Sequence, residues 1–209
     1  KQIMQTGGGV MYVLAAASVL TLAFVVYFLV VIRVGYVVPR SVYRKVLDNI
    51  KDGDSLEEIQ RTCEDTPSPL SVIVVTALDY IKGAGANMKP EALKDIMEGE
   101  GARQSDEIQG RAQYLLDIAV LSPMLGLLGT VVGMLDAFNA VALENAVAKP
   151  VALAGGVSKA LLATAFGLIV GIPAMGFYGY FRRKASKVVS HLEVASLQIY
   201  AALSGRSGK

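Results

Sequence analysis

The stretch LSPMLGLLGTVVGMLDA, from Leu121 to Ala137, decides the fold, because its spacing predicts a membrane helix with two different faces. Small residues recur in it at intervals of three and four, the repeat of an α-helix, and larger aliphatic residues fall elsewhere on the same helix. The small face comprises Ser122, Gly126, Thr130, Gly133, Ala137 and Ala140, and the large face Leu121, Leu125, Leu128, Val132 and Leu135. Such a small face lets the backbones of two helices approach closely inside lipid.

A second stretch, within residues 151–181, repeats the pattern. Its small face comprises Ala160, Thr164, Gly167, Gly171 and Ala174. We expect Gly126, Gly129, Gly133, Gly167 and Gly171 to form the packing contact between the two helices. Two interpretations follow from the pattern: close packing alone, or a narrow polar path between subunits that Thr130 and Thr164 line.

The composition supports an all-α membrane protein with three transmembrane helices and long cytoplasmic helical extensions. Hydrophobic residues make up 53% of the 209 residues, charged residues only 18%, and glycine is frequent at 21. A membrane span needs about 20 apolar helical residues, and we predict three, at 10–32, 114–143 and 151–181. The first is longer than the apolar region of a signal peptide and ends at Arg33, so we expect it to stay in the membrane.

Lysine and arginine set the predicted orientation, because they are enriched on the cytoplasmic side of membrane proteins. They follow the first and third spans and precede the second. We therefore expect residues 1–9 and the short loop 144–150 to be periplasmic. The insert 33–113 and the C-terminal helix 182–209 are then cytoplasmic, and the protein lies in a bacterial inner membrane.

The insert itself is predicted to be helical. Ser55 is a candidate N-cap, Pro69 begins the next helix, Gly85 ends it, and Pro90 opens a third that continues into the second span. After the third span, apolar residues at helical spacing predict one buried face. They are Val188, Leu192, Ala195, Ile199 and Leu203.

The register of the second and third spans places their charged residues at one depth. In an antiparallel pair of helices, residues at the same depth have numbers whose sum is constant. This places Thr130 level with Thr164, and Asp136 level with Lys159, nearer the outside. Because a lone charge within a span is costly, we predict an Asp136–Lys159 pair, within one subunit or between two. The alternative is that either charge extends to the outer interface.

No catalytic or metal-binding constellation is found in the sequence. Cys63 is the single cysteine and His191 the single histidine, too few for a zinc site or a Cys–His nucleophile. We expect no enzyme activity and no cofactor. The net charge of +2 is too small and dispersed for binding nucleic acid.

The stretches Leu121–Phe138 and Gly156–Ala174 resemble the motifs of the MotA/TolQ/ExbB proton-channel family, and three spans favour its ExbB/TolQ branch. The resemblance implies a homopentamer around two copies of an ExbD/TolR-like protein, whose single span bears an aspartate, with a TonB/TolA-like transducer as a further partner. Ion flow driven by the proton-motive force would move one ring against the other. Thr130 and Thr164 match the family's pore threonines.

Two positions depart from the family pattern. Lys159 stands where glutamate is frequent, and Asp136 where asparagine or histidine is frequent. Opposite changes at matching depth are what a swapped polar contact would produce. Three alternatives remain: a sodium-driven version of the same motor, a passive membrane scaffold for partner assembly, and a solute transporter, against which the absence of internal inverted repeats argues.

Overall fold

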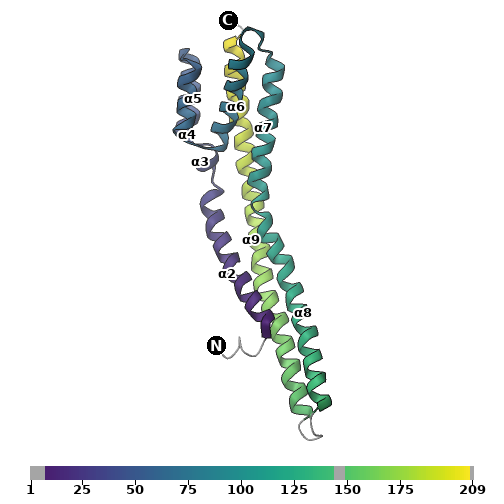
Figure 1. Ribbon diagram of the computed structural model, residues 1–209. Coiled ribbons are helices and arrows are strands. Elements are labelled where there is room, and N and C mark those ends of the chain that lie inside the picture. The colour runs from purple at the N-terminus through teal and green to yellow at the C-terminus, as the bar shows by residue number, and fades with distance from the viewer. Residues whose placement is uncertain (1–7, 144–148, 208–209) are drawn as a thin grey trace. The chain divides into compact units, whose positions relative to one another are not determined.

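The computed structural model describes residues 8–143 and 149–207, and every regular element in these two ranges is a helix (Figure 1). Most of the predicted periplasmic segment 1–9 and loop 144–150 lies outside the described residues. The elements, in chain order, are α2 (Gly8–Val31), α3 (Val34–Val37), α4 (Arg40–Asp52), α5 (Leu56–Glu64), α6 (Pro69–Ala84), the 3-10 helix η1 (Gly85–Asn87), α7 (Pro90–Gly110), α8 (Gln113–Leu143) and α9 (Lys149–Ser207).

The chain divides into two compact units. We call the first the apolar unit; its described residues lie within 1–28 and 112–180. The second, the polar unit, comprises the described residues of 29–111 and 181–209. Helix α9 belongs to both, because its residues up to Tyr180 pack in the apolar unit and those from Phe181 onward in the polar unit.

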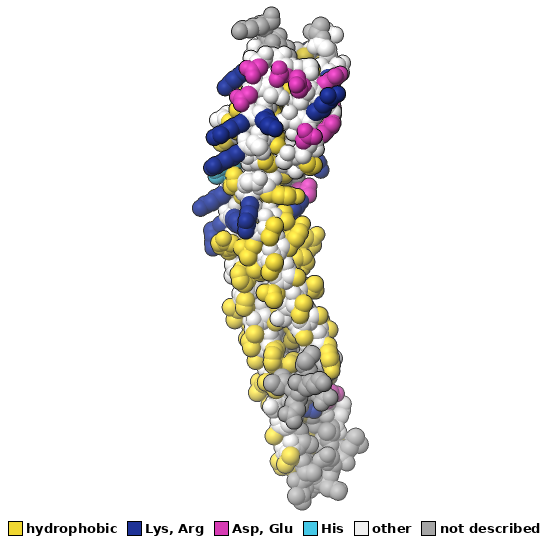
Figure 2. Space-filling view, turned by 90° about the vertical axis from the view of Figure 1, so that its left-hand side faces the viewer, with side chains coloured by type: hydrophobic (Ala, Val, Ile, Leu, Met, Phe, Trp, Pro, Cys, Tyr) yellow, Lys and Arg dark blue, Asp and Glu magenta, His cyan; other side chains and the backbone are white. Residues whose placement is uncertain are grey.

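Among the described residues, three helices are long and apolar enough to cross a membrane, and this confirms the predicted fold class. Hydrophobic side chains gather on the described surface of the apolar unit that is visible in Figure 2. Their exposure fits lipid as the surrounding solvent: Leu127 and Ile169 are 62% exposed, although both lie in the middle of a span. Backbone groups that face lipid need internal partners, and a helix supplies them.

In the polar unit, local signals set the helix ends as the sequence predicts. The Ser55 hydroxyl accepts a hydrogen bond from the backbone N–H of Glu58 and caps α5. Ser68 caps α6 in the same way, directly before Pro69. Gly85 ends α6 with a φ of +51°, a left-handed conformation that favours glycine.

The expected continuation of the third cytoplasmic helix into the second span is wrong in one detail. Helix α7 ends at Gly110 and α8 begins at Gln113, so a turn at Arg111 and Ala112 separates them. The backbone N–H of Arg111 still bonds to the carbonyl of Glu107, and that of Leu115 to the carbonyl of Ala112. Gly110, a poor helix former, lies at the start of this interruption.

The polar unit has a core of large aliphatic side chains. Helices α4 to α7 and the end of α9 each contribute buried residues to it. Members that are at most 1% exposed include Val46, Ile59, Leu70, Ile73, Leu78, Leu93, Leu192 and Ile199. The five residues predicted to form the buried face of the C-terminal helix, Val188, Leu192, Ala195, Ile199 and Leu203, are all at most 5% exposed.

Candidate functional site

The site is built where α8 and α9 meet backbone to backbone in the apolar unit. A Cβ atom placed on Gly126 would lie 2.9 Å from the carbonyl oxygen of Ala163, and one on Gly167 would lie 2.6 Å from that of Ser122. One on Gly171 would lie 2.8 Å from the ring of Pro123. These contacts are to backbone or to a rigid ring, so glycine is needed at the three positions.

The same contact continues toward the far end of the hairpin. Cβ atoms on Gly129 and Gly133 would approach Ala163 and Ala160. Gly156, which was not among the predicted packing glycines, lies against Ala137. It was missed because its own helix carries small residues on several faces at that point, so spacing alone does not single it out.

Helix α2 (Gly8–Val31) covers another side of α8 and runs antiparallel to it. Val10 lies next to Gly129 near one end, and the ring of Phe24 stacks on Tyr114 near the other, with ring centres 5.6 Å apart. The apolar unit is therefore a three-helix bundle in which α8 contacts both other spans.

Thr130 and Thr164 lie at one level of this bundle. The Thr164 hydroxyl donates to the carbonyl of Gly126 across the helix pair, at 3.2 Å. The Thr130 hydroxyl donates to the carbonyl of Leu127, one residue further along the same helix, at 2.6 Å. Both side chains are half-buried. The two hydroxyls thus end on consecutive carbonyl groups of α8, although no hydrogen bond joins them directly.

Asp136 and Lys159 also share a level, since Gly133 lies against Ala160 on one side of them and Ala137 against Gly156 on the other. Both charged side chains are exposed within the chain. The ion pairs among the described residues do not include them. Their pairing, within one subunit or between two, therefore stays a prediction.

Ser122 is a polar residue whose role the sequence does not reveal. It is 1% exposed, and its hydroxyl has no hydrogen-bond partner among the described residues. Its position on the small face of α8 predicts burial against α9. The spacing of small residues does not indicate whether this hydroxyl has a hydrogen-bond partner, because that depends on side-chain geometry.

Cys63 of α5 lies in the polar unit and is buried. Burial, and to a smaller extent the nearby charge of Glu64, raises the pKa of its thiol to about 11. The thiol is therefore protonated at neutral pH, the unreactive form. Among the described residues, no group of three or more His, Cys, Asp or Glu side chains could hold a metal ion.

Comparison with known proteins gives consistent matches. A sequence model of the MotA/TolQ/ExbB proton channel family matches residues 65–194, more than half of the chain. The biopolymer transport protein ExbB of Salmonella typhimurium is 36% identical over 86 residues, 41% of this chain and 35% of that protein. The ExbB protein of Pseudomonas putida is 26% identical over 75% of this chain and 48% of its own length.

The Tol-Pal system protein TolQ of Pseudomonas aeruginosa is 26% identical over 159 residues, 70% of this chain and 68% of that protein. The chain spans about a third to a half of the length of the Salmonella and P. putida relatives. The family match includes all of α8 and the part of α9 that packs against it.

Proposed function

The chain belongs to the MotA/TolQ/ExbB proton channel family, in its ExbB/TolQ-like branch, and on that premise we propose that it forms the ion path of a membrane complex driven by the proton-motive force. It is a multi-pass membrane protein. One observation carries the proposal: two threonine hydroxyls lie at one level of a helix pair whose backbones are in contact and whose outer surface is apolar.

A partner must supply the group that carries the proton. Between Asp117 and Asp136, α8 has no ionisable residue, and α9 has none between Lys159 and Tyr178. A hydroxyl group can pass a hydrogen bond along but does not change charge near neutral pH. Proton relays within membranes use titrating side chains. We therefore infer a single-span partner of the ExbD/TolR type, with a carboxylate at the level of the threonines.

The proposed assembly is a homopentamer around the partner helices, in the inner membrane, with the N-terminus periplasmic and the polar unit cytoplasmic. Ion flow along the threonines moves the partner relative to the ring, and this movement does work on the cell envelope. The many basic side chains of the polar unit near the ends of the spans support this orientation.

The experiment that tests the function measures proton uptake into vesicles that contain this chain and a co-expressed single-span partner. We expect uptake with both proteins, none with either alone, and none when the partner's aspartate is changed to asparagine. An assembled complex that takes up no proton under any gradient would identify a passive scaffold. Uptake that needs a sodium gradient would identify the sodium-driven form.

A further inference from the structure

Two open grooves lie on the polar unit, one on each side of α9. The first is about 540 Å³ and is bounded by α7 and α9, with Ile73 of α6 at its base. Its charged lining is Lys94, Glu98, Asp106 and Glu193, so acids outnumber bases. We call it the acidic groove. Leu197, 59% exposed, gives it an apolar centre.

The second groove is about 640 Å³ and lies between α9 and the segment that contains α3 and the start of α4. Its lining includes the basic side chains Arg40 and His191, and no acid among the described residues lines it. We call it the basic groove. Val194, 54% exposed, is its apolar centre. The hydroxyl of Tyr43 donates to the side-chain oxygen of Gln198 at one end.

The two grooves occupy the same length of α9. The acidic groove uses Val189, Leu192, Glu193, Ser196, Leu197 and Tyr200, and the basic groove uses Ser190, His191, Val194, Ala195 and Gln198. Because successive residues of an α-helix turn by about 100°, these interleaved sets lie on opposite faces at one level.

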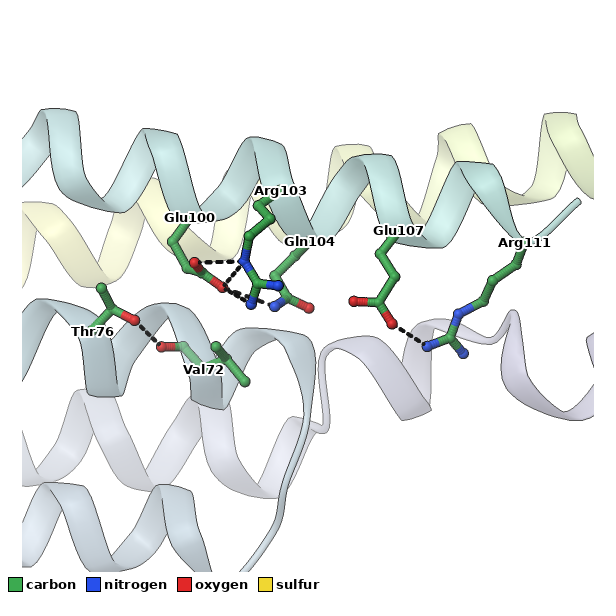
Figure 3. A network of polar contacts seen from close by, with 7 residues as sticks. All are labelled: Val72, Thr76, Glu100, Arg103, Gln104, Glu107 and Arg111. Atoms are coloured by element: carbon green, nitrogen blue, oxygen red, sulfur yellow. Dashed lines mark hydrogen bonds and ion pairs between the residues drawn. The ribbon is translucent and has the colours of Figure 1, made fainter. Parts of the chain in front are cut away.

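In the acidic groove, Lys94 and Glu98 pair with each other at 3.6 Å, so Asp106 and Glu193 are the acids left for a partner. On α7, Glu100 and Glu107 are already paired, with Arg103 at 2.6 Å and with Arg111 at 2.8 Å (Figure 3). By contrast, the ion pairs among the described residues do not include Asp106 and Glu193 of the acidic groove, nor Arg40 of the basic groove. Lysine and arginine side chains gather along one edge of the polar unit in Figure 2, and acids mostly elsewhere.

We propose that the polar units of neighbouring copies meet through these two surfaces: the edge of α4 that bears Arg40 in one copy lies in the acidic groove of the next, against Glu193 and Asp106. Opposite charges face each other around an apolar centre, which is the usual anatomy of a protein interface. This inference rests on the proposed assembly of several copies, and adds the surfaces by which they join.

Because the copies share one orientation in the membrane, this contact between them leads to a ring. All copies cross the bilayer in the same direction, so equivalent residues lie at the same height. A contact between two different surfaces at one height repeats from copy to copy around an axis normal to the membrane and closes into a ring. A two-fold contact would place like grooves together, acid against acid, which charge repulsion disfavours.

Cross-linking through cysteines tests the pairing of surfaces in membranes that contain the full complex. Ser196→Cys marks the acidic groove and Ser190→Cys the basic groove; both side chains are accessible, whereas the native thiol of Cys63 is buried. With a flexible bis-maleimide, each single variant should give no cross-linked dimer. A mixture of the two should give heterodimers, and the double variant a ladder that ends in a closed ring.

The cross-linking results can be distinguished from a failure of the proposed ion path, which proton uptake measures. Dimers from either single variant would show a two-fold contact and overturn the inference. Absence of cross-linking in the double variant would also overturn it, whether or not the complex takes up protons. Proton uptake without the ladder would leave the ion path standing and reject only these surfaces.

A charge swap gives an independent readout. Arg40→Glu and Glu193→Arg should each lower the fraction of assembled oligomer severalfold, measured by native mass spectrometry in detergent at low salt. The double variant should recover at least half of the loss, since each interface then carries the same pair reversed. Two additive losses without recovery would contradict a direct contact between these residues.

Discussion

The apolar and polar units use opposite ways of holding helices together. In the apolar unit, α8 and α9 meet through glycine and alanine, and large side chains such as Leu127 point outward. In the polar unit, large aliphatic side chains such as Leu78 and Ile199 are fully buried, and charged residues point outward. A single helix, α9, contributes to both arrangements.

This difference shows that the surrounding solvent, and not the helix itself, decides which residues form the contacts between helices. Water drives apolar surface inward in the polar unit. Lipid is as apolar as leucine, so nothing drives leucine inward in the apolar unit, and close approach of backbones with their hydrogen bonds takes over. That close approach also brings the Thr164 hydroxyl to the carbonyl of Gly126.

The largest expected effect is the difference in stability loss when the same substitution, leucine to alanine, is made in each unit. Leu78→Ala removes a fully buried side chain of the polar unit and should lower the free energy of unfolding by about 2–5 kcal/mol. Leu128→Ala, at a site 51% exposed in the apolar unit, should change it by less than about 0.5 kcal/mol in detergent. Thermal unfolding of each variant measures both. Equal losses would show that the two units are packed alike.

Adding one carbon at the helix contact should have the next largest effect. Gly167→Ala places a Cβ atom 2.6 Å from the backbone oxygen of Ser122, and this overpacking should cost about 1–3 kcal/mol. Gly176→Ala is the matched control on α9, because nothing lies within 4 Å of its Cβ position. Unfolding in the same detergent compares them. A control that is destabilised as much as Gly167→Ala would mean that the close contact is not the cause.

Hydroxyl groups within the apolar unit should differ from one another. Thr164→Val removes the hydrogen bond to Gly126 and should cost about 0.5–1.5 kcal/mol. Ser122→Ala removes a buried hydroxyl with no partner among the described residues and should be neutral or stabilising. Unfolding of the isolated subunit measures both. A clear loss for Ser122→Ala would reveal a partner for that hydroxyl.

The smallest effect is a pH dependence confined to the polar unit. The hydrogen bond from Arg103 holds the pKa of Glu100 below its ordinary value, and Gln104 adds a second bond. A lowered carboxylate pKa stabilises the fold above about pH 4.3, the ordinary value for glutamate, and this contribution is lost as the pH falls through the lowered pKa. Glu100→Gln should flatten the stability curve in that acidic range. An unchanged curve would contradict the assignment.

Periodicity and helix signals were sufficient to predict much of this structure. Ser55, Gly85 and Pro90 mark helix ends because capping and backbone conformation depend on neighbouring residues only. The register of the second and third spans followed from their antiparallel hairpin, in which residues at one depth have numbers of constant sum. Contacts between distant segments were beyond such reasoning: examples are Val10 against Gly129 and Gly156 against Ala137.

The charged residues show the same limit. Numbers alone place Asp136 and Lys159 at one depth, but the direction of each side chain depends on how two helices are rotated, which the sequence does not specify. The two grooves of the polar unit likewise depend on how α4, α7 and α9 pack together.

The central claim, that ions pass along the threonines of α8 and α9, is tested most directly by proton uptake into vesicles with Thr164 varied and the partner present. Thr164→Val should abolish uptake while assembly stays intact, and Thr164→Ser, which keeps the hydroxyl, should retain most of it. Thr21→Val is the control, since that hydroxyl bonds only to Ala17 within α2. Full uptake by Thr164→Val would contradict the account.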